Sequence, residues 1–343
     1  MDSVKHRFAA GRGYLAACTL GLPVDATRDA LRRDLDAWEH GTSSAMEYTA
    51  VVERARGHAA TLLGVESSRV ATGSQVSVFA GLAAAAAPKD AEIICIDGDF
   101  SSVVAPFLAR GDLRVRHVPV SALADAVSPE TWMVAYSLVQ SATGEVADAA
   151  SVTTAARDAD ALTLVDTTQA TGWLPTTDLE GDLVVCHAYK WLSAPRGAAF
   201  AAFSDRALAQ IAPLTAGWYA GADPWASCYG PDLHLAADAT RFDVSPAWHA
   251  WAGAEAALDF ATSLDADAVH DHALGLANAF RARIGEPAGD SAIVSWLDDE
   301  GRDLAALTAA GITASGRAGR ARVAFHLWND EEDVDLAAGA LGR

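Results

Sequence analysis

The sequence predicts an α/β protein: a large domain built on a mostly parallel seven-stranded sheet, followed by a smaller C-terminal α+β domain. Three observations support this. Short apolar runs alternate with helical segments along the first 200 residues, a pattern typical of parallel sheets. Two of these runs, residues 93–96 and 162–165, are largely apolar on both faces, as buried parallel strands are. After residue 203 the chain becomes rich in tryptophan, tyrosine, glycine and proline.

The expected strands, in chain order, are residues 69–72, 92–96, 113–118, 132–137, 162–166, 183–187 and 198–203. Helices are expected at residues 76–87, 102–110, 149–156 and 205–211. The first of these helices follows Thr72-Gly73-Ser74-Gln75, which is a good N-terminal capping sequence.

The rest of the chain should hold loops, a long helix and the small domain. The composition of residues 212–240 indicates loops near a site. A long helix over residues 248–260 should lead into the second domain, which should have a strand at 321–328 and a last helix at 332–341. We therefore place the large domain at residues 13–250 and the small domain at 251–343, with residues 1–40 packing against the small one.

Composition excludes several classes of protein. With 343 residues, 51% of them hydrophobic, the chain can bury a sizeable core. A formal net charge of −20 should repel nucleic acids and anionic lipids, so neither is an expected partner. The four cysteines form no CxxC pair and no metal-ligand spacing, so no metal site is expected. This cysteine pattern and the absence of a signal-peptide pattern favour a reduced, cytoplasmic protein.

Asp166 and Lys190 follow two successive apolar runs, and this is the most informative feature of the sequence. Both should emerge at the carboxyl edge of the sheet, where open α/β sheets bind ligands. The pairing suits an enzyme that holds pyridoxal phosphate: the lysine forms the Schiff base (the internal aldimine), and the aspartate keeps the pyridine nitrogen protonated. Alone, Asp166 could simply cap a turn.

Lys190 has the more common alternative of a solvated surface lysine. The chain has only two other lysines, Lys5 and Lys89. Lys190 alone follows a strand and lies between aromatic residues, Tyr189 and Trp191. Desolvation there would lower its pKa and favour the free amine, so we prefer the functional interpretation.

Other candidates are weaker, and each has an ordinary structural alternative. Gln169 could bond a ligand oxygen, and Phe100 could stack on a flat ring, although aromatics usually belong to the core. Ser74 and Gln75 start an expected helix, where backbone N–H groups favour phosphate. The remaining candidates are two possible phosphate donors, His187 and Tyr189, and four possible carboxylate-binding arginines, Arg241, Arg317, Arg320 and Arg322.

In four ordered blocks the chain resembles the class V aminotransferase and cysteine desulfurase family of fold-type I pyridoxal phosphate enzymes. The blocks are Tyr14-Leu15 with Gly21-Leu22-Pro23; Ser137 through Thr143-Gly144-Glu145-Val146; Val165-Asp166 through Gln169, Gly172, Pro175, Asp182 and Tyr189-Lys190 to Gly197; and Arg322 through Trp328-Asn329 to Val334. The third block is specific, whereas the others would not be specific alone.

The resemblance implies a role for each matching residue. Lys190 matches the Schiff-base lysine, Asp166 the pyridinium partner, and Gln169 the residue that bonds the ring hydroxyl. Arg322 matches the arginine that grips the substrate carboxylate. The other positions implied to contact the cofactor are Phe100 at the ring, Ser74, Gln75, His187 and Tyr189 at the phosphate, and Gln140 from the second block.

The resemblance also implies a homodimer with shared sites. The segment 241–246 resembles the one that reaches into the neighbouring subunit, with Ser245 near the neighbour's phosphate. The aromatic segment around Trp218 suggests a pocket for an apolar substrate side chain, or packing at the dimer interface.

The sequence departs from the family in two places. Residues 311–320, where desulfurases carry their nucleophilic cysteine, contain none, so persulfide chemistry at that place is excluded. Ala16 and Ala17 stand where relatives often carry asparagine, so one carboxylate contact can be missing.

Several functions stay open. The sequence favours an aminotransferase acting on a small amino acid, with a kynureninase-like or selenocysteine-lyase-like elimination or C–S/C–C lyase as the alternative. A non-catalytic cofactor-binding protein is disfavoured because both Lys190 and Asp166 are present. A nicotinamide-dependent enzyme is disfavoured because no G-x-G-x-x-G follows the early strands.

Overall fold

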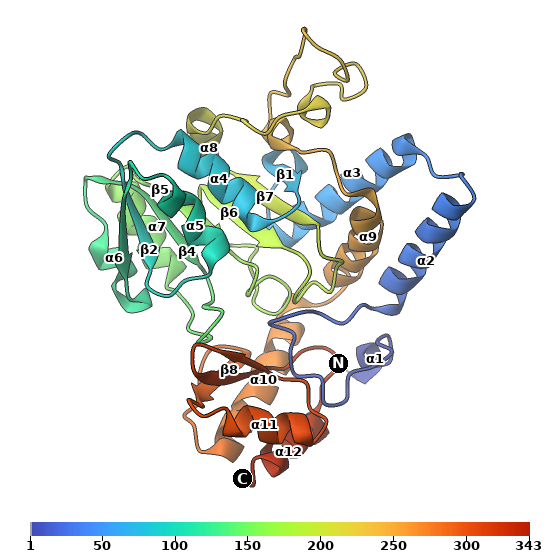
Figure 1. Ribbon diagram of the computed structural model, residues 1–343, viewed down its shortest axis with the longest axis vertical. Helices are drawn as coiled ribbons and strands as arrows, with labels where there is room; N and C mark the ends of the chain where they lie inside the picture. Colours follow the sequence, from blue (N-terminus) through green and yellow to red (C-terminus); the bar gives the residue numbers. More distant parts are fainter. Residues whose placement is uncertain (1) are drawn as a thin grey trace.

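The computed structural model describes residues 2–343. Figure 1 shows a large body that carries the main sheet and, below it, a smaller body of orange and red elements that ends the chain. The seven-stranded sheet has the order β1-β7-β6-β5-β4-β2-β3, and of these strands only β7 runs antiparallel to its neighbours. The prediction of a mostly parallel seven-stranded sheet is confirmed.

Each strand lies within one residue of its expected bounds. The strands are β1 Val70–Gly73, β2 Glu92–Ile96, β3 Arg114–Val118, β4 Thr131–Ser137, β5 Leu162–Asp166, β6 Leu183–His187 and β7 Ala199–Phe203. Side chains alternate between two apolar layers: along β4, Met133 and Ala135 pack into one layer, Val134 and Tyr136 into the other. Burial on both faces explains why these strands appear in the sequence as continuous apolar runs.

Helices on both faces complete the layers. The helices along this part of the chain are α4 Val76–Ala86, α5 Ser101–Ala109, α6 Leu123–Ala126, α7 Ala149–Asp158 and α8 Asp205–Gln210, with the short 3-10 turns η1 Ser67–Arg69 and η2 Val120–Ala122. Phe79 of α4 and Phe107 of α5 fill one apolar layer, and Val152 of α7 fills the other.

Two long helices that the sequence analysis did not place, α2 Asp25–Glu39 and α3 Ala45–Leu63, pack with α9 Trp248–Thr262 beside the sheet, on the right of Figure 1. The chain begins with α1 Asp2–Lys5. Only Thr27 of α2 is buried, so the apolar pattern that identifies a helix is weak there. Helix α3 ends at Gly64 in a left-handed conformation (φ 67°), where a Cβ would collide with the carbonyl of Thr177.

The smaller body consists of α10 Ala266–Ile284, β8 Ile293–Leu297, α11 Arg302–Ala309, β9 Ser315–Arg317, β10 Arg320–Ala324 and α12 Glu331–Ala340. Its sheet has the order β8-β10-β9, and two of these strands were not expected. Isolated bridges join Tyr14 to Thr313 and Ala16 to Ala324, so the N-terminal segment extends this sheet. The domain boundary between residues 250 and 251 stays a prediction.

The expected strand at residues 321–328 is wrong in its second half. Strand β10 ends at Ala324, and the chain then turns so that the backbone N–H of His326 donates to Asn329 Oδ1 (3.0 Å). The side chains of residues 325–328 are buried, but their backbone forms a turn. An apolar run alone does not distinguish a buried turn from a buried strand.

In the sequence between α8 and α9 lie the 3-10 turns η3 Trp218–Ala220 and η4 Ala239–Phe242, within loops that project at the top of Figure 1, away from the smaller body. Aromatic side chains are exposed there, including Tyr229 and Trp225. Nowhere in residues 2–343 is a helix both long enough and apolar enough to span a membrane.

Candidate active site

Polar side chains gather where the parallel strands of the main sheet end. The carboxyl ends of β4, β5 and β6 lead into loops that share one cavity with the start of α4 and of α5. It is lined by Gln75, Val76, Phe100, Ser102, Ser137, Ser141, Asp166, Thr168, Gln169, His187, Tyr189, Lys190 and Arg196. The structure thus brings seven of the expected site residues together at the carboxyl edge of the sheet.

Lys190 lies in the turn after β6, and its side chain is buried (5% exposed). Its Nζ is 5.2 Å from the ring centre of Phe100 and 5.6 Å from that of Tyr189. Within the described chain no carboxylate forms an ion pair with it. Burial lowers the pKa of Lys190 to about 8, although the Asp166 carboxylate opposes that effect. The neutral, nucleophilic amine is therefore much easier to reach near physiological pH than in a solvated lysine, although the protonated form still predominates there.

The turn that presents Lys190 is tightly constrained. The N–H of Ser193 donates to the Lys190 carbonyl (3.0 Å), and Ser193 itself has a left-handed backbone (φ 57°). Gly21 of the N-terminal segment donates to the Tyr189 carbonyl, and a Cβ at Gly21 would collide with the carbonyl oxygen of Lys190. Only glycine allows this close approach, so the N-terminal segment can brace the lysine turn.

Asp166 ends β5 and is buried (4% exposed). One carboxylate oxygen, Oδ1, accepts a hydrogen bond from the N–H of Thr168 (2.8 Å). Burial raises the pKa of Asp166 to about 6, opposed by the bond from Thr168 and by the Lys190 charge. Its other oxygen, Oδ2, forms no hydrogen bond within the described chain, so it is available to a ligand nitrogen.

Gln169 is held by groups on three sides. Its Oε1 accepts from the indole N–H of Trp191 (2.9 Å), and its Nε2 donates to the Cys18 carbonyl (2.8 Å) and to Ser141 Oγ (3.1 Å). The indole of Trp173 donates to the Gln169 backbone carbonyl (2.6 Å). A bond from Gln169 to a ligand oxygen therefore requires it to release Ser141 or Cys18.

The expected phosphate end lies at the start of α4. Gln75 is the N-cap residue and lines the cavity, whereas Ser74 does not. The expectation of side-chain capping is wrong, because the Gln75 side chain makes no capping hydrogen bond and leaves the first N–H groups of α4 available. His187 packs edge-on against Tyr189 (4.4 Å between ring centres), and burial lowers the pKa of His187 to about 4, so it is neutral.

Arg322 on β10 is almost fully buried (1% exposed) and faces only neutral oxygen atoms. It donates to Ser315 Oγ (3.1 Å), to the carbonyl and Oγ of Ser141, and to Thr19 Oγ1 (3.0 Å). Burial lowers the pKa of Arg322, yet a guanidinium stays charged in proteins. A buried guanidinium without a counter-ion within the described chain is well suited to donate hydrogen bonds to an anionic ligand.

Besides Ser74 and Arg322, three expected residues do not line this cavity in their own chain. Gln140 is buried nearby in the loop after β4, and its Nε2 has no hydrogen-bond partner within residues 2–343. Trp218 packs against Tyr219 and Trp225 (5.0 and 5.2 Å between ring centres), and Ser245 is exposed. The roles of these three residues stay predictions.

Of the other expected arginines, none lines the cavity. Arg320 donates to the side chain and carbonyl of Ser295 (2.9 and 2.8 Å), and Arg317 donates to the carbonyl of Gly316. Arg241 donates to the carbonyl of Leu208. Among the four candidates, only Arg322 is placed to bind a carboxylate.

Sequence reasoning missed several residues that the structure places here. Arg196 lines the cavity and lies over the Tyr189 ring (4.7 Å), and its position six residues after Lys190 could have identified it. Thr19 and Ser141 contact Arg322 from segments that are far apart in sequence, and no pattern signalled them.

The donor set fits pyridoxal phosphate. A buried, partly neutral amine could hold the aldehyde carbon, and the free oxygen of Asp166 could meet a protonated ring nitrogen. The exposed Phe100 ring lies beside the amine (5.2 Å), and the uncapped start of α4 could take the phosphate. The enclosed space is about 30 Å³, and beyond it the site is open on the side of the exposed Gln75, Phe100 and Arg196.

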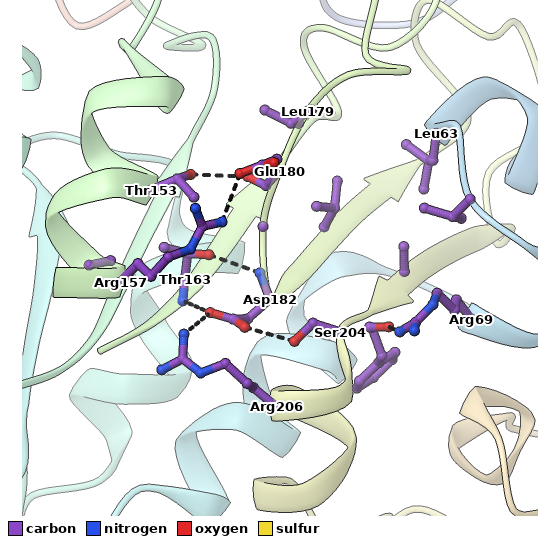
Figure 2. Close-up of a pocket in the computed structure, with 16 residues that line it drawn as sticks. Leu63, Arg69, Thr153, Arg157, Thr163, Leu179, Glu180, Asp182, Ser204 and Arg206 are labelled. Atoms are coloured by element: carbon purple, nitrogen blue, oxygen red, sulfur yellow. Dashed lines mark hydrogen bonds and ion pairs between the residues drawn. The ribbon is translucent and has the colours of Figure 1, made fainter. Parts of the chain in front are cut away.

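A larger cleft, of about 540 Å³, lies at the opposite edge of the sheet. Figure 2 shows its charged residues turned toward one another: Arg157 pairs with Glu180 (2.7 Å), and Arg206 reaches Asp182 (3.4 Å). Asp182 also accepts from Ser204 (2.7 Å). With its charges already paired, this cleft holds no group prepared for chemistry, so cavity size does not identify the active site.

No cluster of acidic, histidine or cysteine side chains that could hold a metal ion occurs among the described residues. The three cysteines Cys18, Cys95 and Cys186 are buried and unpaired, and Cys228 is exposed.

Comparison with known proteins supports the assignment of this cavity as a pyridoxal phosphate site. A family model described as aminotransferase class V matches residues 37–316. A kynureninase from Deinococcus radiodurans is 31% identical over 265 residues, which cover 73% of this chain and 63% of that protein. The match therefore spans less than two thirds of the kynureninase's length.

Solved structures share the fold across nearly the whole chain. The cystine C–S lyase C-DES, in complex with cysteine persulfide, has a TM-score of 0.86 at 19% identity and covers 96% of this chain and 97% of its own. The cysteine desulfurase CsdA from Escherichia coli has a TM-score of 0.83 at 19% identity and covers 100% and 97%.

Proposed function

The chain belongs to the class V aminotransferase family of pyridoxal-phosphate-dependent enzymes, and we propose that it acts on a small amino acid through Lys190. When bound, pyridoxal phosphate withdraws electrons from the bonds next to the substrate nitrogen. One observation carries the proposal: Lys190, Asp166 and Arg322 are all buried, and none has an ion-pair partner within the described chain. Three such charges would be costly without a ligand to satisfy them.

Lys190 serves as the attachment point and then as the proton carrier. Its lowered pKa makes the neutral amine readily available, so Lys190 could bond the cofactor and later accept a proton from the substrate carbon. Phe100 and Tyr189 flank the amine and exclude water from it.

Asp166 stabilises the positive charge of the protonated nitrogen at the far end of the cofactor ring. Its oxygen Oδ2 would accept a hydrogen bond from a protonated ring nitrogen, while the N–H of Thr168 fixes Oδ1. A positive ring nitrogen beside the carboxylate would bring the pKa of Asp166 down again from about 6, because an opposite charge favours the ionised form.

Arg322 binds the substrate carboxylate. The incoming carboxylate replaces neutral contacts to Ser141 and Thr19 with a charge-assisted, bidentate pair. This would turn the amino group of the substrate toward Lys190, because Arg322 bonds Ser141, which lines the cavity together with Lys190.

The kynureninase relative moves the proposed reaction from transamination toward cleavage next to the β carbon. Transamination, the default for the family, stays as the second candidate. A desulfurase that uses a cysteine in residues 311–320 is excluded, because that segment has none.

We propose a homodimer whose partner closes the open side of the site. Ser245 and Trp218 do not reach the cavity of their own chain, and the loops around them expose Leu214, Trp225 and Tyr229. Apolar residues exposed together mark an interface, so Ser245 would serve the partner's phosphate and Trp218 the partner's substrate.

The reaction type can be tested with amino acid alone. The holoenzyme is mixed with a large excess of L-kynurenine, L-cystine or L-alanine, without any keto acid. A lyase converts many equivalents of one amino acid, whereas an aminotransferase stops after one equivalent per site until a keto acid is added. No conversion of any amino acid, with or without keto acids, would contradict the proposed activity.

A further inference from the structure

His326 is a fully buried polar residue beside the site that the proposed mechanism does not use. It is 0% exposed, and it lies four residues after Arg322, just beyond the end of β10. Its ring lies edge-on between Trp191 and Trp328 (5.2 and 5.0 Å between ring centres). Its backbone N–H donates to Asn329 Oδ1 (3.0 Å), so the small body holds it firmly.

The ring of His326 reaches across to the lysine turn. Its Nε2 lies 2.8 Å from the carbonyl oxygen of Trp191, the residue after Lys190. Burial lowers the pKa of His326 to about 4, so the ring is neutral and carries one N–H. A carbonyl can only accept, so the proton sits on Nε2, and Nδ1 is left without a hydrogen-bond partner among the described residues.

A bare ring nitrogen in a fully buried place is costly, and such groups are rare unless their position matters for another reason. An apolar side chain would fill the same space without that cost. The retained contact is the bond to the Trp191 carbonyl, which points to a role in placing that turn.

A chain of hydrogen bonds leads from Trp191 back to Arg322. The indole of Trp191 donates to Gln169 Oε1 (2.9 Å), and Gln169 Nε2 donates to Ser141 Oγ (3.1 Å). Arg322 donates to the same Ser141 Oγ (3.1 Å). The backbone from strand β10 then connects Arg322 to His326, so the contacts form a closed cycle.

We propose that His326 is a positioning residue that couples carboxylate binding at Arg322 to the placement of Lys190 and Gln169. A carboxylate that takes Arg322 away from Ser141 frees a contact of Gln169 and shifts the strand that carries His326. Because His326 holds the Trp191 carbonyl, that change reaches the lysine turn. This inference rests on the proposed function, in which Arg322 binds the substrate carboxylate.

The test uses holoenzyme labelled with 5-fluorotryptophan, with the Trp191 resonance assigned by Trp191→Phe. The probe is propionate, a carboxylate without an amino group. We compare the wild type with His326→Leu, which removes the donor, and His326→Gln, which restores an N–H at a similar reach. Phe325→Leu is the matched control, because Phe325 is equally buried but packs against Phe280 in the small body.

Propionate should shift the Trp191 resonance in the wild type, in His326→Gln and in Phe325→Leu. In His326→Leu that shift should be lost, while the propionate dissociation constant, read as competition against substrate, stays within about threefold because Arg322 is intact. The value of kcat for His326→Leu should fall by up to about 100-fold with little change in KM, and His326→Gln should recover most of it.

Two results would overturn the proposal: a wild-type Trp191 resonance that ignores propionate, or a His326→Leu resonance that shifts as the wild type does. The failure of the proposed function has a separate signature, which is a protein that takes up no pyridoxal phosphate and shows no visible band. In that case the same fluorine comparison is run on the cofactor-free protein, where it still reports whether propionate acts on the turn that holds Trp191.

Discussion

The two edges of the main sheet carry charged residues under opposite conditions. At the carboxyl edge, Lys190 and Asp166 are 5% and 4% exposed, and neither forms an ion pair within the described chain. At the amino edge, in the cleft of Figure 2, Arg157 and Glu180 pair at 2.7 Å, and their side chains are 64% and 69% exposed. Paired, solvated charges cost little, whereas unpaired, buried charges lower stability.

This difference in burial and pairing indicates that the carboxyl edge of the sheet carries the chemistry. The larger cleft is the one at the amino edge, but its charges are already satisfied. The smaller site keeps a lysine with a lowered pKa, an aspartate with a raised pKa and an arginine without a counter-ion. Shifted pKa values of this kind are typical of active sites. Substitutions on the two edges should therefore have effects of very different size.

The largest effect is expected from Lys190→Ala. Turnover should fall by at least about 10³-fold, because the variant loses both the attachment point and the proton carrier. Steady-state kinetics of the holoenzyme would measure this, with circular dichroism to show that the fold is kept. Turnover close to that of the wild type would remove Lys190 from the mechanism.

Arg322→Gln should have the next largest effect. The value of kcat/KM for an α-amino acid should fall by roughly 30- to 1000-fold, because a buried charge-assisted pair contributes about 2–4 kcal/mol. Arg322→Lys should not restore it, since lysine lacks the bidentate fork. Amines without a carboxylate should be affected far less, and an equal loss for both kinds of substrate would contradict the assignment.

The pKa of Lys190 predicts a stability effect in the cofactor-free protein. Between pH 8 and 10.5 the unfolded chain keeps a proton on this amine that the folded chain has lost, so Lys190 makes the protein more stable as the pH rises through that range. Below it, the buried charge costs about 3 kcal/mol.

Lys190→Met should therefore be more stable than the wild type by about 3 kcal/mol at pH 7, and the difference should disappear toward pH 10.5. Urea unfolding of both cofactor-free proteins at several pH values would measure the two free energies. A variant less stable than the wild type at pH 7 would show that the lysine is not a buried, unpaired charge.

The smallest effect is expected at the amino edge. Arg157→Ala should change the free energy of unfolding by no more than about 1 kcal/mol, because exposed ion pairs contribute little. Its turnover should match that of the wild type. A loss of turnover comparable with that of Arg322→Gln would show that the two edges do not differ as described.

The sequence predicted those strands and helices that are determined by the residues within them. Buried parallel strands need apolar residues on both faces, so β4, β5 and β6 could be placed within a residue. Their order along the chain then put Asp166 and Lys190 at one edge. Helix α2 was missed because it buries only Thr27, and residues 325–328 were assigned to a strand because a buried turn can be as apolar as a strand.

The contacts around Arg322 could not be predicted in the same way. Thr19 and Ser141 approach it from 303 and 181 residues away, Thr19 through its hydroxyl and Ser141 through its hydroxyl and its backbone carbonyl. A hydroxyl has no sequence pattern that marks such a partner. The bond between His326 and the Trp191 carbonyl, across 135 residues, is of the same kind.

The most direct test of the account is the visible spectrum of the purified holoenzyme before and after borohydride, followed by peptide mapping. The account predicts a yellow protein that bleaches on reduction, with the cofactor fixed to Lys190. A protein that stays colourless after addition of pyridoxal phosphate, or a label on Lys5 or Lys89, would contradict it.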